Sequence, residues 1–466
     1  MTESAISRQY APLVSLGVPI VIGQVGNIVL GFADTLMVGH HSMEELAAAS
    51  FVNTMFMLFV IFAMGYSYGL TPLVGSSHGR GDDDAIGATV RAGLAGATML
   101  AAALLAVLSA LYAWLDRLGQ PAELLPLMRP YLLVNMASLP FVCWMNAFKQ
   151  FFDAVGDTKT PMAVLVGGNV MNILGNWLLI YGVGPAPELG LLGAGISTLA
   201  SRVAMAAAFA LLFGLTRRCA PYRRGFGRRP GGGLLRRVNA LGLPLALQMG
   251  MESAAFSLSA ILVGWIGTTA LAAHQVMLTV SQVFYMVYYG MGAAVAVRVS
   301  YFRGQGDLGL VRATASAGFR IILAVACVVA VPIFLLRGSL SLVFTDSAAV
   351  CALVAQTVVP LMAYQVGDGM QCTFANALRG IAHVRPMMYI AFFSYFVVSL
   401  PLGWLLGIRL GYGLVGVWWA FPVCLTCAGL LYRLCFARRL AAMQAGGERA
   451  PGCRHGRRGA FQEKKH

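Results

Sequence analysis

The amino-acid sequence predicts an all-α polytopic membrane protein, with twelve transmembrane helices in two six-helix lobes that are related by a pseudo-twofold axis along the membrane normal. Composition is the first observation behind this prediction. Of the 466 residues, 58% are hydrophobic and 11% are charged, and the mean hydropathy is +0.74. About a quarter of the residues in an ordinary soluble domain are charged, so this chain lacks the polar surface that would keep it in solution. The other two observations are apolar runs of membrane-spanning length and an internal repeat.

Apolar runs of roughly 20 to 30 residues, separated by polar or Gly/Pro-rich breaks, each predict one membrane-spanning helix. Twelve such runs place both chain termini on the same side of the membrane. In order along the chain, the helices are expected to begin near Ala11, Leu46, Ala88, Leu127, Pro161, Leu191, Asn239, Leu271, Ala313, Cys351, Arg385 and Gly413.

The net charge of +15 is concentrated in loops and at the C-terminus. Residues 216–238, between the sixth and seventh spans, contain eight arginines and no acidic residue. Cytoplasmic loops are rich in Lys and Arg, so both termini and this loop are expected to be cytoplasmic. Neither basic segment offers aromatic platforms or a recognition fold, and therefore no nucleic-acid partner is expected. Further inner loops are expected to hold Lys149 and Lys159, Arg298 and Arg303, and Arg379 and Arg385.

The second half of the chain repeats the first at an offset of 225 residues. Leu16–Pro19 corresponds to Leu241–Pro244, and Gly79–Asp82 corresponds to Gly304–Asp307. With six helices in each half, both copies start on the same side and form parallel repeats, an arrangement that suits alternating access. The repeat divides the chain into an N-terminal lobe (1–215), a basic cytoplasmic linker (216–238), a C-terminal lobe (239–437) and a basic, disordered cytoplasmic tail (438–466).

Three acidic residues are predicted to lie well inside the spans: Asp34, Glu252 and Asp368. Each costs about 2.5 to 3.5 kcal/mol at a helix centre, so their presence needs a reason. Their repeat partners are not acidic, which argues against a role in the fold alone. Burial favours the neutral form of a carboxyl group, and such a group is suited to carrying a proton. A structural, hydrogen-bonded carboxyl remains the alternative.

Polar side chains accompany these acids at helical spacing, and they must face protein or a watered cavity rather than lipid. Tyr364 and Asp368 share one helix face, and Gln248 precedes Glu252 by one turn. Hydrogen bonding between helices is an equally good explanation for the amide side chains, and the partner of Arg202 within the sixth span is left open. The residues predicted to line a substrate cavity are Asn27, Asn172, Asn176, Gln248, Gln275, Gln282 and Tyr285.

Several motifs together resemble the multidrug and toxic compound extrusion (MATE) family, in particular its NorM-like branch. They are Gly31–Gly39, Ala272–Gln275, Pro187–Gly190, Tyr364–Asp368 and Leu378–Gly380, and the resemblance spans nearly the whole chain before the tail. It implies a monomeric, multi-pass protein of the bacterial inner membrane that exports organic cations in exchange for entering H⁺ or Na⁺. It also implies cation coupling by Asp34, Glu252, Asp368 and Tyr364, with Glu252 and Asp368 as Na⁺ ligands if sodium is the coupling ion.

Two other functions are compatible with a helical membrane protein: a lipid-precursor flippase and a membrane-embedded enzyme. A flippase for anionic lipid-linked sugars should line its cavity with Arg or Lys, whereas the charge inside these spans is mostly acidic. An enzyme should show a metal cluster or an activated nucleophile. Gly75–Gly79 fits the GxSxG pattern, but it follows a membrane helix instead of a strand, so no catalysis is expected there. No cofactor other than the coupling ion is expected.

Overall fold

The computed structural model describes residues 3–117, 119–184, 187–227 and 232–446. In these ranges twelve helices are long and apolar enough to cross a membrane, which confirms the predicted count. Each predicted starting residue lies in a different one of them. The helices of the first half are α1 (Glu3–His41), α2 (Met43–Ser67) with α3 (Leu70–Arg80), α4 (Asp83–Ala113), α5 (Leu125–Ala154), α6 (Lys159–Ile180) and α7 (Gly190–Leu215).

The second half has the same order of helices. The eleventh span of the chain, which belongs to this half, alternates between α-helical and π-helical turns. It consists of α13 (Arg385–Phe392), a π-helix (Phe393–Ser399), α14 (Leu400–Trp404) and a second π-helix (Leu405–Arg409). The other helices of this half are α9 (Gly232–Ile266), α10 (Thr268–Gln305), α11 (Leu308–Leu335), α12 (Ala348–Gly380) and α15 (Gly413–Ala445).

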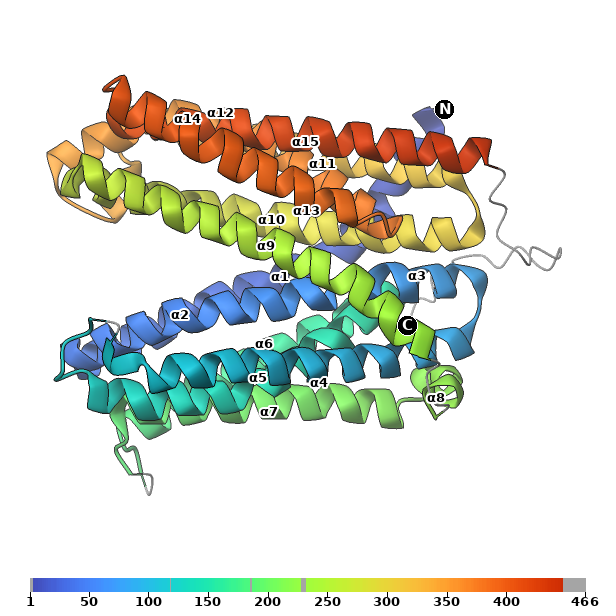
Figure 1. Cartoon of the computed structure of the whole chain (residues 1–466), viewed down its shortest axis with the longest axis horizontal. Helices are drawn as coiled ribbons and strands as arrows, with labels where there is room; N and C mark the ends of the chain where they lie inside the picture. Colours follow the sequence, from blue (N-terminus) through green and yellow to red (C-terminus); the bar gives the residue numbers. More distant parts are fainter. Residues whose placement is uncertain (1–2, 118, 185–186, 228–231, 447–466) are drawn as a thin grey trace.

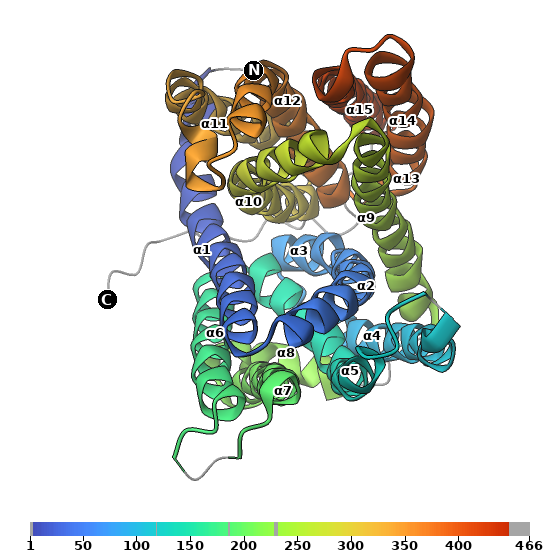
Figure 2. The same cartoon turned by 90° about the vertical axis from the view of Figure 1, so that its left-hand side faces the viewer.

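The helices form two bundles, and α1 and α9 each cross from one to the other (Figures 1 and 2). Ile6 and Leu13 near the start of α1 belong to the core of the C-terminal lobe, whereas α1 also packs along α6 of the N-terminal lobe. Helix α9 contacts both α2 and α13. A helix of 39 residues such as α1 is roughly 58 Å long, about twice the thickness of the hydrocarbon core, so it can tilt across both lobes.

One contact between the lobes occurs twice, at positions related by the repeat. A side chain at Gly79 would overlap the carbonyl oxygen of Tyr301, and one at Gly304 would overlap the carbonyl oxygen of Ser76. Residues 79 and 304, like 76 and 301, are 225 apart, so these are two copies of one contact. Such reciprocal contacts are the signature of a twofold axis, here between α3 and α10. The glycines allow the two backbones to touch.

Equivalent caps begin the third helix of each lobe. The Asp82 carboxylate accepts a hydrogen bond from the backbone N–H of Ala85 (2.9 Å), and Asp307 accepts one from Leu310 at the same distance. Such caps satisfy donors that the first turn of a helix leaves unpaired. The preceding Gly81 and Gly306 have φ angles of 72° and 79°, which glycine adopts without strain. The repeat in sequence is therefore a repeat in structure.

The two lobes meet at the end of the molecule where α1 begins and α15 ends (Figure 1). We call this the basic end, because α8 (Ala220–Gly227) and the 3₁₀ turn before it (Arg217–Cys219) lie there and carry four arginines. Helix α8 packs against α4, so part of the predicted linker is ordered. Helix α15 continues past Arg438 to Ala445, while the remainder of the predicted tail, 447–466, lies outside the described residues.

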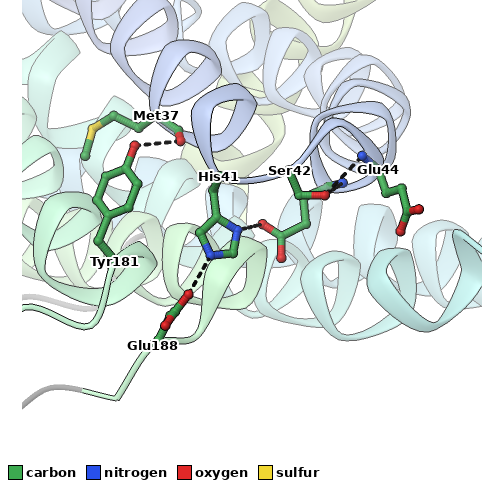
Figure 3. A network of polar contacts seen from close by, with 7 residues as sticks. Met37, His41, Ser42, Glu44, Tyr181 and Glu188 are labelled. Carbon is green, nitrogen blue, oxygen red and sulfur yellow. Dashed lines mark hydrogen bonds and ion pairs between the residues drawn. The ribbon is translucent and has the colours of Figure 1, made fainter.

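A polar network at the opposite end ties the α1–α2 turn to the segment before α7 (Figure 3). His41 contacts the carboxylates of Glu45 (2.8 Å) and Glu188 (3.1 Å) through its two ring nitrogens. The hydroxyl of Tyr181 donates to the carbonyl oxygen of Met37 (2.9 Å). These contacts hold the outer end of α1 against the N-terminal lobe, two turns beyond Asp34.

Candidate functional site

A cavity of about 60 Å³ lies where α9, α10 and α12 approach the α2–α3 junction. Its lining residues belong to the C-terminal lobe, except for Tyr68 at the α2–α3 junction of the N-terminal lobe. Carboxylate, amide, phenol and guanidinium groups all contribute to its lining. The lining residues are Tyr68, Leu245, Gln248, Met249, Glu252, Tyr285, Tyr289, Asp368, Gln371, Cys372, Ala375, Asn376, Arg379 and Met387.

Two of the three predicted acids share this cavity. Glu252 enters from α9 and Asp368 from α12, and the two carboxyl groups lie within electrostatic range of each other. Gln248, one turn before Glu252, donates from Nε2 to its Oε2 at 3.1 Å. Asp368 is 3% exposed, and its Oδ2 has no hydrogen-bond partner in the described part of the chain. An unpaired, buried carboxyl oxygen is costly, so it is available to a proton or a cation.

Tyr364 and Tyr285 occupy different positions around the acids. Tyr285 lines the cavity. Tyr364 is buried and is absent from the lining; its ring packs 6.2 Å from Trp418 and 6.3 Å from Phe421, centroid to centroid. Because it lies one turn before Asp368, this packing holds that part of α12 against α15. Tyr364 can thus position Asp368 through the helix.

Asp34 is in a separate site within the N-terminal lobe. Asn176 donates from Nδ2 to Asp34 Oδ1 at 2.5 Å, and it also donates to Asn172 Oδ1 at 3.2 Å. Rotating the Asn172 amide gives a second donor to Asp34, at 3.1 Å. The sequence assigned Asp34 to cation coupling together with Glu252 and Asp368, and it did not show that Asp34 lies apart from them.

Arg202 lies in the same lobe as Asp34. It donates to the hydroxyl of Ser138 (2.6 Å), and its guanidinium lies 5.3 Å from the centre of the Phe56 ring. Asp34 is within electrostatic range, although no direct ion pair joins the two in the described structure. Arg202 therefore places a positive charge near Asp34 without pairing with it directly.

The remaining predicted residues do not line the cavity. Asn27 accepts a hydrogen bond from Asn169 (3.3 Å), so it joins α1 to α6. Gln275 and Gln282 are exposed along α10, a helix of the C-terminal lobe that contacts α3 of the other lobe (Figure 2). Asn172 and Asn176 face Asp34 instead. These five residues thus lie outside the cavity of Glu252 and Asp368, because helical spacing shows which residues share a face and does not show what that face meets.

Three basic residues that were predicted to lie in inner loops lie within helices. They are Lys149 in α5, Arg379 in α12 and Arg298 in α10, which donates to Gln9 Oε1 of α1 at 2.7 Å. Lys149 and Asp153 are 6% and 2% exposed within α5, where Lys149 Nζ donates to Asp153 Oδ2 at 2.8 Å. Arg379 is 4% exposed within α12 and lines the cavity. The i,i+4 spacing of Lys149 and Asp153 was the available signal, since oppositely charged residues one helical turn apart pair with each other.

Comparison with known proteins places these features in a family. The sequence model of the MatE family matches residues 19–178 and 244–405, which is one match in each lobe. The probable multidrug resistance protein NorM of Photorhabdus laumondii is 28% identical over 419 residues, covering 88% of this chain and 92% of that protein.

Solved structures share the fold at lower sequence identity. A transporter of the MOP superfamily from Pyrococcus furiosus superimposes with a TM-score of 0.83 at 21% identity, covering 93% of this chain and 96% of its own. A eukaryotic MATE transporter superimposes with a TM-score of 0.84 at 18% identity, covering 95% and 99%. Together with the twelve spans and the twofold repeat, the family match over both lobes shows that this chain belongs to the MatE family, whose members are transporters and not enzymes.

Proposed function

We propose that the protein is a secondary active multidrug efflux antiporter, which exports organic cations in exchange for H⁺ or Na⁺ moving inward. One observation supports this most: Glu252 and Asp368 line a single cavity, which Tyr68 of the N-terminal lobe also lines. Two neighbouring carboxyl groups cannot easily both be charged when buried, so the site favours a bound cation or proton. The name of the Photorhabdus relative agrees with multidrug transport.

The coupling cation binds at Glu252 and Asp368 in this proposal. Hard cations such as Na⁺ prefer oxygen ligands, and the amide oxygens of Gln248 and Gln371 add to the two carboxylates there. In the described ranges no group of three or more His, Cys, Asp or Glu side chains forms a transition-metal site. Protons need only one carboxyl with access to water, so the same residues serve H⁺ equally well.

Alternating access explains how binding becomes exchange. The lobes are in contact at the basic end, and their ribbons diverge toward the other end (Figure 1). We assign the basic end to the cytoplasm of a bacterial inner membrane, because Lys and Arg concentrate on that side. The structure then corresponds to a conformation closed toward the cytoplasm. Gln275 and Gln282, exposed on α10, face the space between the lobes, since exposed amides avoid lipid.

Transport in proteoliposomes tests this function. The purified protein is reconstituted, and export of a monovalent cationic dye is followed while a pH gradient and a Na⁺ gradient are imposed separately. Dye movement driven by either gradient is the expected result. Movement of an anionic lipid-linked sugar without dye transport would instead support a flippase, and no response to either gradient would contradict antiport.

A further inference from the structure

Polar side chains from both lobes gather around Arg379, toward the basic end. The N-terminal lobe supplies Tyr68, Lys149 and Asp153, and the C-terminal lobe supplies Tyr289 and Arg379. Tyr68, Tyr289 and Arg379 line the cavity, whereas Lys149 and Asp153 lie outside its lining and within electrostatic range of Arg379. We call these five residues the inner cluster. Tyr68 and Tyr289 are joined through their hydroxyl groups, and the Arg379 guanidinium lies 4.6 Å from the centre of the Tyr68 ring. The cluster therefore exists only while the lobes are together at this end.

The inner cluster lies on the path from the acids to the basic end. Asp368 and Arg379 both line the cavity from α12, and they are eleven residues apart. At 1.5 Å per residue this separation is roughly 16 Å along the helix, with Arg379 next to the C-terminal end. Leu245 of α9, two turns before Glu252, lines the same end of the cavity. A cation leaving the carboxylates toward the basic end must therefore pass Arg379.

The charges of the inner cluster sum to +1. Lys149 pairs with Asp153, while no carboxylate in the described residues forms an ion pair with Arg379. The Nε atom of Arg379 and the Oδ1 atom of Asp153 have no hydrogen-bond partner in the described chain. Buried charges interact strongly, because little solvent screens them. A buried, incompletely paired guanidinium is expensive, so packing alone does not account for it.

The repeat shows that the scaffold does not require these charges. At the offset of 225 residues, Lys149 corresponds to Phe374 and Asp153 to Leu378. Arg379 corresponds to Ala154 in the other lobe. Glycine contacts and helix caps recur in both copies, whereas this cluster does not. The charges of the inner cluster therefore have no counterparts at the equivalent positions of the repeat, and neither do Glu252 and Asp368.

We propose that the inner cluster is a charge barrier that stops the coupling cation from leaking through the closed lobes. This inference rests on the antiport function proposed above. The net positive charge repels a cation bound at Glu252 and Asp368 while the lobes meet at the basic end. When the lobes separate there, Arg379 moves away from Tyr68, Lys149 and Asp153, so the barrier comes apart and the cation is released.

Substitutions that differ in charge at Arg379 test the barrier. In proteoliposomes without dye, decay of an imposed gradient is followed with trapped pyranine for H⁺ and with ²²Na⁺ uptake for sodium. Arg379→Gln is expected to speed the decay of the coupling-ion gradient at least tenfold, whereas Arg379→Lys keeps it within about twofold of the unmodified protein. Arg385→Gln removes an exposed arginine at the start of α13 and serves as the matched control.

Substitutions in the Lys149–Asp153 pair distinguish a charge barrier from a packing role. Lys149→Gln lowers the net charge of the cluster to zero, and Asp153→Asn raises it to +2, although each breaks the same ion pair. Of these two variants, only Lys149→Gln is expected to let the coupling ion leak through the closed lobes. Equal leakage in both variants, or in Arg379→Gln and Arg379→Lys, would show that the cluster merely packs the lobes together. Either pair of variants alone decides the question if a member of the other does not fold.

Dye transport by the unmodified protein tests the antiport proposal separately from the charge-barrier proposal. If neither gradient drives dye export, the antiport function fails, whatever the variants do. If the unmodified protein exchanges dye for a cation, and Arg379→Gln and Lys149→Gln exchange it with no added leak, antiport stands and the charge barrier is overturned.

Discussion

The acidic residues of the two lobes have different neighbours, and this difference assigns them different tasks. Glu252 and Asp368 share one cavity, and Asp368 keeps an unpaired oxygen. Asp34 is instead held by Asn176 and lies near the fixed charge of Arg202. A carboxylate with donors already in place has less need of a bound cation. We therefore expect coupling to depend most on the acids of the C-terminal lobe.

Asp368→Asn is expected to abolish gradient-driven dye export, with a loss of at least tenfold, while folding is preserved. The amide has nearly the same size as the carboxyl, but it cannot bind a proton at ordinary pH and it lacks the negative charge that holds a cation. Dye flux in proteoliposomes measures the loss, and a thermal melt in detergent checks the fold. Undiminished antiport by this variant would remove Asp368 from the coupling site. Glu252→Gln is expected to behave in the same way.

At the scale of elements, the contact between α3 and α10 determines whether the basic end is closed. Gly79 touches the backbone of α10, and Gly304 touches the backbone of α3. Close approach of two backbones gives extensive van der Waals contact, which is a main source of helix association within membranes. The same glycines leave no room for a side chain, so this interface is sensitive to a single methyl group.

Gly79→Ala is expected to destabilise the protein by about 1 to 3 kcal/mol, because the added methyl group overlaps the Tyr301 carbonyl. Gly214→Ala is the matched control, since nothing lies within 4 Å of a Cβ at that helical position. There the same substitution should be neutral, or should stabilise by about 0.5 to 1 kcal/mol through helix propensity. Thermal denaturation in detergent compares the two. A Gly79→Ala variant as stable as Gly214→Ala would contradict the close packing.

The whole molecule combines a symmetric scaffold with asymmetric charges. Its caps and interlobe contacts repeat at 225 residues, while the acids and the inner cluster occur once each. Symmetric packing allows two lobes to rock about a shared axis, and asymmetric charge gives the transported ions one defined route. Orientation in the membrane and the number of ions exchanged are properties of the whole molecule.

Both chain termini are expected to be cytoplasmic, and reporter fusions at Gly184 and Arg224 should therefore report opposite sides. Gly184 precedes α7 at the end remote from α8, and Arg224 lies in α8 at the basic end. Alkaline phosphatase activity should appear at Gly184, and a reporter active in the cytoplasm should work at Arg224. The same side for both would mean that the number of spans between them is wrong.

Exchange is expected to be electrogenic. One H⁺ for one monovalent dye moves no net charge, so a pH unit alone supplies about 1.4 kcal/mol, or tenfold accumulation. A second entering cation adds about 2.3 kcal/mol at 100 mV, or nearly fiftyfold more. Three intramembrane acids in two lobes have the capacity for more than one cation.

Collapsing the membrane potential with valinomycin and K⁺, at fixed pH and Na⁺ gradients, measures the stoichiometry. The rate and the final gradient of dye export should both fall. An unchanged rate and final gradient would indicate one-for-one exchange, and Asp34 would then act in gating or cargo binding.

Twelve spans, the repeat and three acids within the membrane could be predicted from the sequence alone. These features follow from local hydropathy and from residues at a constant offset, so they can be found without knowing which helices touch. A common site for Glu252 and Asp368 was also expected, but that Asp34 lies apart from it came only from the folded chain. The tertiary structure also decided that α1 and α9 cross between lobes, and that Lys149, Asp153 and Arg379 are buried rather than in loops. Proximity between distant helices depends on tilt and long-range packing, which no single helix specifies.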